Sequence, residues 1–273
     1  MSGAGLSVLA GNLPDGLGED PADSRNYVTA LARGLAVIRA FSGQNQQMTL
    51  SDVARVAELP RATVRRCLLT LQALGYVDVA GRFFSLSPQV LTLAQAYLRS
   101  SVLPRVAQPF LERVSEQVGE SCSVSILHGT EVIYVARSSR KRIASLHRDV
   151  GTHLPAYCTS MGRVLLASLP PGELAQFFRG VMLEAFTPFT LTTEAQLRVA
   201  LEQVAREGYC IVDQELEIDL RSLAVPVRNG SGRVVAALNV STQASRTTAD
   251  MLVSRFLPVL RSTAAAMRPL LIG

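Results

Sequence analysis

Between residues 27 and 87 the sequence carries three helical patterns followed by a strand–turn–strand pattern, and this succession limits the chain to few folds. In residues 27–41 apolar side chains recur every three or four positions, which predicts the first helix. These apolar residues are Val28, Leu31, Leu35, Ile38 and Phe41. Thr49 is then followed three positions later by Asp52, which resembles a capping box and predicts a second helix that extends to Ala57.

The third predicted helix carries the densest group of basic residues in this region. We expect it to begin near Pro60, because proline is tolerated in the first turn of a helix, and to end at Gly75. The residues predicted to face the core are Val64, Cys67, Leu68, Leu71 and Leu74. The residues predicted to face outward are Arg61, Thr63, Arg65, Arg66 and Thr70. The outer face of this helix is therefore basic and bears hydroxyl groups, mostly in its first two turns.

A hairpin pattern follows the third helix. Two short β-prone runs, residues 76–79 and 82–86, flank a turn that contains Gly81. Three helices followed by a hairpin predict a winged helix-turn-helix. The first residues of a recognition helix meet base edges in the major groove, where arginine pairs with guanine and threonine offers a hydroxyl and a methyl group. Arg82 lies in the hairpin, where it can meet a phosphate or the minor groove.

Any one of these residues alone fits a solvated basic surface, but the combination of capped helix, tight turn, basic helix and basic hairpin predicts DNA binding. The predicted DNA-binding residues are Thr49, Ser51, Arg61, Thr63, Arg65, Arg66, Thr70 and Arg82. Residues 25–103 hold nine arginines against three carboxylates, whereas residues 1–24 hold four carboxylates and no cation. A compact basic block of this kind is typical of a nucleic-acid module joined to something else, although charge alone would also fit a soluble basic domain.

A chain of 273 residues is long enough for two domains. We expect a disordered tail at residues 1–24, the winged helix-turn-helix at 25–87, a linker helix at 88–103 and a second domain at 104–273. The linker is predicted to start at Ser87-Pro88 and is apolar over most of its girth. Such a helix is expected to be buried against a second protomer, and packing on its own chain is the alternative.

Residues 104–273 alternate between helical and β-prone segments. Strands are predicted at 121–127, 131–137, 142–147, 209–212, 223–228 and 233–241. Helices are predicted at 106–118, 160–167, 173–178, 193–207 and 248–267. Hairpins with helices before, between and after them predict an α+β domain in which helices pack on a central antiparallel sheet.

Composition bears on the compartment. No stretch reaches the length of uncharged apolar sequence that a membrane span needs, and residues 1–23 lack the basic start and apolar run of a secretory signal. The four cysteines are scattered without a CxxC pair, which argues against a disulfide framework and a zinc knuckle. We therefore expect a cytoplasmic protein that does not bind membranes.

Several segments resemble the IclR family of transcription regulators. The helix-turn-helix resemblance runs from Thr49 through Leu68 to Gly75-Tyr76-Val77, and it continues at 151–167, 212–217 and 220–227. The agreement covers about nine-tenths of the chain, everything after the tail. The form Pro155-Ala-Tyr-Cys-Thr-Ser-Met-Gly-Arg163 is similar to the branch that regulates protocatechuate and 4-hydroxybenzoate catabolism. In two places the sequence departs from the family pattern: Arg163 stands where lysine is frequent, and Ile218-Asp219 replaces a more usual Leu-Gly.

The resemblance implies a regulator of an aromatic catabolic operon that forms a dimer, often paired into a tetramer, with a GAF-like effector domain. It implies two partners, double-stranded operator DNA and a small aromatic carboxylate, and no cofactor. An aromatic acid needs a cation or amide donors for its carboxylate, an apolar slot for its ring and hydrogen-bonding groups for its hydroxyls. The candidates near the predicted sheet and its loops are Tyr134, Arg137, Arg148, His153, Tyr157, Ser160, Met161, Asp213, Glu215, Leu220, Arg221 and Ser222.

Several candidates have plainer explanations. Tyr134 and Met161 fit a hydrophobic core, and Asp213 and Glu215 fit ion pairs with neighbouring arginines. Two other functions also deserve comparison. An enzyme would use Cys122, Cys158 or Cys210 as a nucleophile, yet no cysteine is paired with an obvious histidine base. A metal sensor would use His128, His147, His153 and Asp213, which are too scattered for a ligand signature. We therefore predict neither catalytic residues nor a metal site.

Overall fold

The computed structural model describes residues 26–41, 45–138 and 149–272. The chain divides into two compact units, Met1–Tyr97 and Leu98–Gly273, and each is described by itself below.

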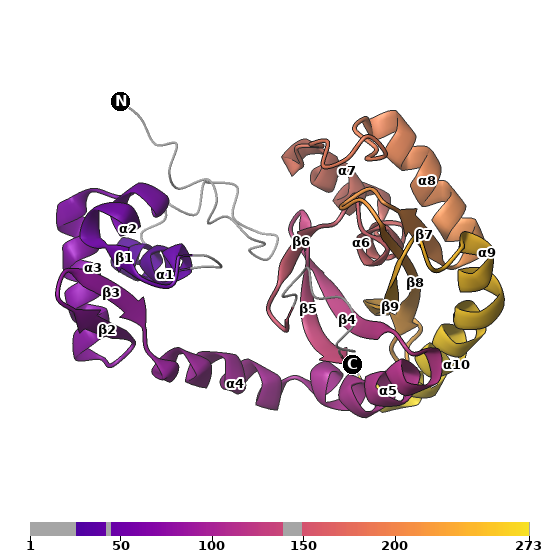
Figure 1. The fold of residues 1–273 in the computed structure, drawn as a ribbon, viewed down its shortest axis with the longest axis horizontal. Coiled ribbons are helices and arrows are strands. Elements are labelled where there is room, and N and C mark those ends of the chain that lie inside the picture. The colour runs from indigo at the N-terminus through magenta and orange to yellow at the C-terminus, as the bar shows by residue number, and fades with distance from the viewer. Residues whose placement is uncertain (1–25, 42–44, 139–148, 273) are drawn as a thin grey trace. The chain divides into compact units, whose positions relative to one another are not determined.

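The N-terminal unit is a three-helix domain with a small sheet (Figure 1). Its helices are α1 (Thr29–Ala40), α2 (Leu50–Val56) and α3 (Arg61–Ala73). The predicted capping box is confirmed, since the Thr49 hydroxyl accepts a hydrogen bond from the Asp52 amide while the Asp52 carboxylate accepts one from the Thr49 amide. The buried apolar core consists of Val37, Ala40, Met48, Val53, Ala54, Val64, Leu68, Leu71 and Val77.

The sheet of this unit has the order β1-β3-β2, with strands β1 (Met48–Thr49), β2 (Val77–Ala80) and β3 (Phe83–Leu86). β2 and β3 form the predicted hairpin, and its two-residue turn is Gly81-Arg82. Gly81 has a φ of +61°, a conformation that favours glycine. Strand β1 was not predicted, because two residues are too few to show a periodicity. The fold is the expected winged helix-turn-helix.

One sequence expectation about burial in this unit is wrong. Leu74 is 61% exposed, because α3 has already ended and the chain turns at Gly75, whose φ is +80°. On α1 the buried residues are Ala32, Val37 and Ala40 rather than the larger residues of the stripe. Val28, Leu31 and Leu35 are 62%, 63% and 42% exposed, whereas Ile38 and Phe41 pack against the core, so only the first part of the stripe faces away from it.

A short 3-10 turn, η3 (Pro88–Val90), follows the hairpin and leads into α4 (Leu91–Ser100). The Ser87 hydroxyl accepts a hydrogen bond from the Gln89 amide, as expected for the capping residue. None of the residues of α4 is buried, and Leu91 is 65% exposed. Pro104 was expected to close the linker, but it lies in the first turn of the next helix, α5 (Val102–Val118), where a proline needs no partner for its nitrogen.

The C-terminal unit is built on a six-stranded antiparallel sheet of order β6-β5-β4-β9-β8-β7 (Figure 1). The strands are β4 (Ser121–His128), β5 (Glu131–Ser138), β6 (His153–Pro155), β7 (Cys210–Asp213), β8 (Leu220–Arg228) and β9 (Val234–Gln243). β6 was not predicted, and the run predicted at 142–147 lies outside the described residues. Helices pack on both faces of this sheet, as expected for the α+β class.

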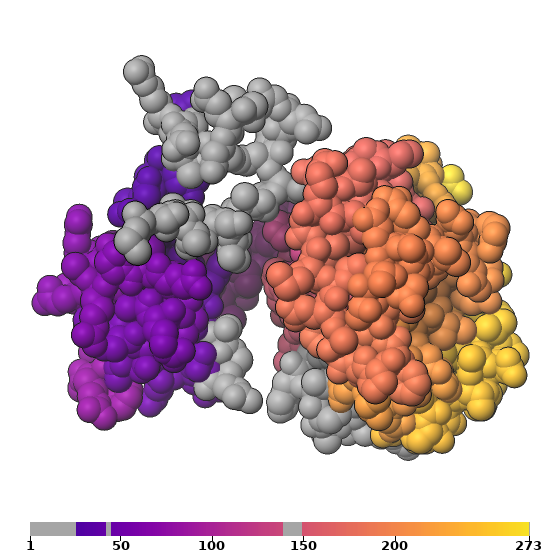
Figure 2. Space-filling model, turned by 90° about the horizontal axis from the view of Figure 1, so that it is seen from above, coloured from indigo at the N-terminus to yellow at the C-terminus, as the bar shows by residue number. Residues whose placement is uncertain are grey.

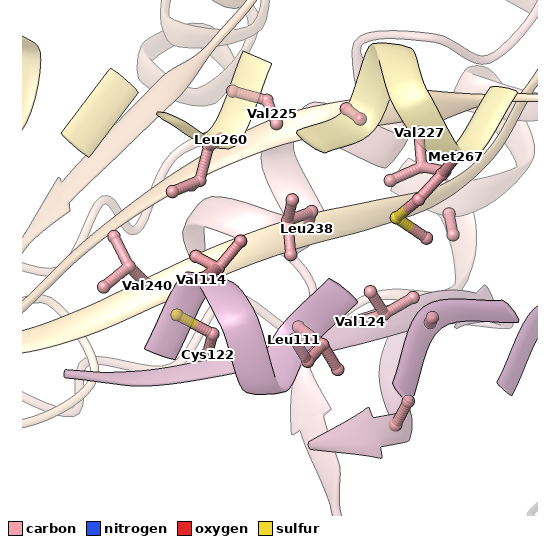
Figure 3. Packing of buried hydrophobic residues seen from close by; sticks show 14 of the residues in the cluster. Leu111, Val114, Cys122, Val124, Val225, Val227, Leu238, Val240, Leu260 and Met267 are labelled. Atoms are coloured by element: carbon pink, nitrogen blue, oxygen red, sulfur yellow. The ribbon is translucent and has the colours of Figure 1, made fainter. Parts of the chain in front are cut away.

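One face is covered by α5 and by the C-terminal helices α9 (Ala249–Met251), η4 (Leu252–Phe256, a π-helix), α10 (Leu257–Met267) and η5 (Arg268–Leu270). The buried apolar cluster between these helices and the sheet contains the residues labelled in Figure 3. They are Leu111, Val114, Cys122, Val124, Val225, Val227, Leu238, Val240, Leu260 and Met267. This face is filled with aliphatic side chains, which leaves the opposite face for polar chemistry.

On the opposite face α6 (Ser160–Leu166) packs against the sheet and α8 (Glu194–Glu207) packs on α6, while Phe177 of α7 (Pro171–Gly180) belongs to the same buried apolar cluster. All seven residues of α6 are buried, and α8 packs on this helix. The coral and orange atoms in Figure 2, which belong to the stretch that contains α7 and α8, form the outer surface there. The α6 face of the sheet is therefore enclosed by helices and is the face on which most candidate effector residues lie.

Candidate functional site

The outer face of α3 has the character that the sequence predicts. Arg61, Arg65, Arg66 and Thr70 are exposed and Thr63 is half-buried, whereas Val64 and Leu68 of the same helix are fully buried. The Thr70 hydroxyl donates to the Arg66 carbonyl, which orients it along the helix. Arg65 and Arg66 are exposed basic side chains on consecutive positions of α3, an arrangement suited to a DNA groove and its phosphates.

Three of the predicted DNA-binding residues also hold the domain together. The Thr49 hydroxyl donates to Asp52 at 2.6 Å and caps α2. The Arg61 guanidinium donates to the Ser51 hydroxyl, which ties the start of α3 to the start of α2. These contacts fix the angle between the two helices of the motif.

Arg82 lies in the exposed turn of the hairpin, and its guanidinium carbon is 5.2 Å from the centroid of the Phe83 ring. The ring restricts the motion of the Arg82 guanidinium but leaves its N–H groups without acceptors, so these groups can donate to a phosphate.

A small pocket lies on the α6 face of the C-terminal sheet. Its walls are mainly apolar and include a few hydroxyl groups and one amide. The lining residues are Tyr134, Leu154, Cys158, Thr159, Met161, Val212, Leu216, Leu220, Ser222, Asn239 and Ser241. Four predicted effector residues, Tyr134, Met161, Leu220 and Ser222, therefore line one cavity, and its lining is that expected for a small ligand with an apolar ring.

A β-bulge brings the predicted cation to this face. Ala136 pairs with Val124 and Tyr134 pairs with Ser125, so Val135 is an extra residue without a partner on β4. Because of the bulge, Tyr134 and Arg137 lie on the same face although they are three residues apart. The guanidinium carbon of Arg137 is 5.8 Å from the centroid of the Tyr134 ring.

Among the described residues, four buried side-chain atoms have no hydrogen-bond partner: Ser125 Oγ, Arg137 Nε, Ser160 Oγ and Asn239 Oδ1. Three of them lie on neighbouring strands, since Arg137 pairs with Ser123 on β4, Ser123 pairs with Asn239 on β9, and Ser125 is next to this row. Ser160 is the first residue of α6, which packs on these strands. Buried polar groups without partners cost free energy, and their gathering on one face makes it the candidate site for a ligand.

Three predicted effector residues are engaged elsewhere. Arg221 donates to both carboxylate oxygens of Asp213, at 2.9 and 2.8 Å, and its third nitrogen donates to the Thr247 carbonyl. His153 is exposed, and its Nδ1 lies 2.9 Å from the Glu131 carboxylate. None of these three lines the pocket, although their strand neighbours Val212, Ser222 and Leu154 do, because adjacent residues of a strand point to opposite faces of the sheet.

Two further candidates support the wall of the pocket. The Tyr157 hydroxyl donates to the Glu184 carbonyl at 2.6 Å, and burial raises the pKa of Tyr157 to about 12. Glu215 is buried and accepts hydrogen bonds from Arg163 at 2.5 Å and from the Leu191 amide at 3.1 Å. These bonds tie the connection between α7 and α8 to the rest of the unit. Arg148 lies outside the described residues.

Sequence reasoning missed several polar residues of this face, namely Ser125, Asn239 and Ser241. A usable signal was present, because strands β4 and β9 place Ser121, Ser123, Ser125, Asn239 and Ser241 on alternate positions among apolar residues. A strand with one polar face usually shows that face to solvent, so the pattern alone indicated a surface rather than a buried pocket.

The alternatives of a cysteine enzyme and a metal sensor gain little from the structure. Burial raises the pKa of the thiols of Cys122 and Cys210 to about 12, opposite to the lowering that activates a nucleophile. His153 and Asp213 lie at opposite edges of the sheet, and His147 is outside the described residues. Across the described part of the chain, no three residues of the types that ligate metals come together. In the same part, no helix is both long and apolar enough to span a membrane.

Two family models match this chain. Residues 30–80 match the IclR helix-turn-helix domain, and residues 95–268 match the C-terminal domain of the bacterial transcriptional regulator IclR. The Pca regulon regulatory protein of Pseudomonas putida is 48% identical over 86% of this chain and 81% of its own length. The p-hydroxybenzoate hydroxylase transcriptional activator of Acinetobacter baylyi is 36% identical over 90% of this chain and 93% of its own length.

Solved structures agree with these matches. A putative transcriptional regulator from Rhodococcus sp. RHA1 is 51% identical with a TM-score of 0.79, and the match covers 90% of this chain and 98% of that one. An IclR homologue from Microbacterium hydrocarbonoxydans, solved in complex with 4-hydroxybenzoate, is 28% identical with a TM-score of 0.75. That match covers 89% of this chain and 98% of the homologue.

Proposed function

Because this chain belongs to the IclR family of bacterial transcriptional regulators, we propose that it controls genes of aromatic catabolism in response to a hydroxybenzoate-like acid. Residues 25–87 read the operator, and the pocket beside α6 receives the acid. Two observations on relatives support this choice of ligand: one is named for p-hydroxybenzoate hydroxylase and another was solved with 4-hydroxybenzoate.

The observation that carries the proposal is the position of Arg137. Its Nε is buried without a partner, and its guanidinium lies beside the ring of Tyr134, which lines an apolar pocket. An aromatic carboxylate supplies an anion for the Arg137 guanidinium and a flat apolar surface for the Tyr134 ring. The unpartnered hydroxyls of Ser125 and Ser160 are additional donors for carboxylate oxygens.

Operator binding is supported by the exposed arginines of α3 and by Arg82 in the hairpin turn. Bases are read by side chains at the start of the recognition helix, and arginines in the hairpin add phosphate contacts. A protein that acts on an operator works beside the chromosome, so we place it in the cytoplasm.

Self-association is supported by two exposed apolar surfaces. Leu91, Leu93 and Tyr97 of α4 are 65%, 49% and 45% exposed, and α1 exposes Val28, Leu31 and Leu35 as well. Apolar surface of this extent on helices next to the DNA-binding core is typical of a protein interface. We propose a homodimer or a dimer of dimers, which suits an operator with two half-sites.

Isothermal titration calorimetry of the full chain tests the effector assignment, with 4-hydroxybenzoate, protocatechuate, benzoate and an aliphatic dicarboxylate as ligands. We expect the hydroxybenzoates to bind and to change operator affinity in a gel-shift titration at fixed salt. Binding of the aliphatic acid in their place would contradict the assignment, while operator binding would be judged separately by the gel shift.

A further inference from the structure

Asn239 lies at the centre of the sheet and lines the pocket. It is on β9, where its neighbours across the strands are Ser123 of β4 and Ala224 of β8. The residue is only 1% exposed, although asparagine is ordinarily a surface residue. Its burial among apolar pocket residues is costly unless both ends of its amide have partners.

The amide of Asn239 has a partner at one end only. Its Nδ2 donates to the Ser241 hydroxyl at 3.1 Å, which gives this end of the amide a partner. Its Oδ1 is buried and has no partner among the described residues. The free end is a carbonyl oxygen, so the missing partner must be a hydrogen-bond donor.

The donor and the anion of a hydroxybenzoate lie at opposite ends of one ring. Arg137 and Asn239 belong to the same row of the sheet and are separated by one strand, β4. Their backbones are therefore roughly 10 Å apart, twice the spacing of neighbouring strands. A flat ligand between the two side chains can place its carboxylate at the cation and its hydroxyl at the amide oxygen.

We propose that Asn239 is the residue that selects hydroxylated aromatic acids, by accepting a hydrogen bond from the ring hydroxyl at Oδ1. Ser241 acts as a positioning residue that holds the amide oxygen toward the ligand. This inference rests on the proposed function, because it assumes that the pocket receives an aromatic acid. Neither role depends on the carboxylate contact, so the two ends of the ligand can be tested separately.

Calorimetry on the full chain with four ligands provides the test. 4-Hydroxybenzoate and 4-aminobenzoate carry a donor on the ring, whereas benzoate and 4-fluorobenzoate do not. For the wild-type protein we expect the two donors to bind at least about tenfold more tightly than the other two. The Asn239→Leu variant, similar in size but without an acceptor, should lose this preference and keep its affinity for benzoate within about threefold.

Ser241→Ala leaves Asn239 in place and removes only the group that orients its amide. We expect a partial loss of the preference for donors, with benzoate affinity unchanged. Ser254→Ala is the matched control, since Ser254 is exposed on η4 and its hydroxyl donates to the Asp250 carbonyl. Thermal unfolding of each variant establishes that it is folded, and Ser241→Ala provides the answer if Asn239→Leu does not fold.

Three outcomes would overturn the inference. A wild-type protein that binds benzoate as tightly as 4-hydroxybenzoate leaves the proposed function intact and removes the role of Asn239. If Asn239→Leu lost affinity for 4-hydroxybenzoate and benzoate equally, and Ser241→Ala kept the preference for 4-hydroxybenzoate, Asn239 would be a structural residue. A wild-type protein that binds none of the four acids overturns both the inference and the proposed function.

Discussion

The guanidinium carbon of Arg137 lies 5.8 Å from the centroid of the Tyr134 ring, on the same face of the sheet, although the two residues are three positions apart on one strand. In a regular strand these side chains would point to opposite faces. The bulge at Val135 places the cation beside the aromatic wall of the pocket, and Val135 itself joins the aliphatic core on the other face.

Replacing Arg137 by glutamine should weaken effector binding about ten- to a hundredfold, since a lost charge-assisted hydrogen bond costs on the order of 1.5–3 kcal/mol. Operator affinity without effector should stay unchanged, because Arg137 is not in the DNA-binding unit. Calorimetry and gel-shift titration measure the two properties. Arg221→Gln is the comparison: it breaks the pair with Asp213 and should lower the melting temperature more than it changes effector affinity. If Arg137→Gln bound the effector as tightly as the wild type, Arg137 would not be the residue that binds the carboxylate.

Removing the side chains of Arg65 and Arg66 together should weaken operator binding strongly and leave the domain folded, because both are exposed. Arg82→Ala should weaken binding to all sequences and reduce the salt dependence by about one counterion. Gel-shift titration at two salt concentrations distinguishes these effects. If the double variant bound the operator with wild-type affinity, α3 would not be the recognition helix.

Gly162→Ala should disrupt the effector pocket. A Cβ at this position would lie 2.0 Å from the carbonyl oxygen and 2.4 Å from the Cα of Ala156, so α6 must move away from the preceding segment. We expect the variant to lose at least about 2 kcal/mol of unfolding free energy and to lose effector binding as well. Gly172→Ala is the control, because nothing lies within 4 Å of the added atom there. An unchanged melting temperature in Gly162→Ala would contradict the close approach.

The contribution of Asp219 to the free energy of unfolding should decrease at acid pH. The Ser245 amide donates to its carboxylate and holds the pKa of Asp219 below its ordinary value of 3.8. A carboxyl whose pKa is lowered by folding adds stability above the unfolded pKa, and this stability is lost as the pH falls through the folded pKa. Asp219→Asn should therefore be less stable than the wild type near neutral pH, and the gap should narrow as the pH falls below 3.8 toward the lowered pKa of Asp219.

Thermal unfolding between about pH 3 and pH 7 measures this gap. Asparagine is a suitable replacement because position 219 has a φ of +65°, which asparagine tolerates better than most residues. A gap that did not change with pH would mean that the charge of Asp219 contributes nothing.

The protein should have a solution mass of at least about twice the 29.4 kDa of one chain. Leu91→Glu places a charge on the exposed apolar face of α4 and should shift the mass toward the monomer. Size-exclusion chromatography with light scattering measures both. A wild-type monomer at micromolar concentration would leave the exposed residues of α1 and α4 without an explanation.

Much of the N-terminal unit could be predicted because its signals are local. The capping box joins Thr49 to Asp52 within one turn, and the helical spacing that buries Val64 and Leu68 leaves Arg65 and Arg66 outside. The exposure of the first apolar residues of α1 could not be predicted, since periodicity identifies a helix with an apolar stripe but does not say which molecule covers it.

The sequence by itself determined the order of the elements, the basic recognition helix and the residue types of the pocket. Only the tertiary structure decided which polar side chains meet there. Strand alternation gives the two faces of a strand, but the pairing of Arg137, Ser123 and Asn239 in one row depends on register between strands far apart in the sequence. The pairing of β7 with β8 places Arg221 against Asp213 and so occupies one of the three arginines that the sequence offered to the effector. A bulge of one residue reverses the face of every side chain beyond it, and no local pattern records such a bulge.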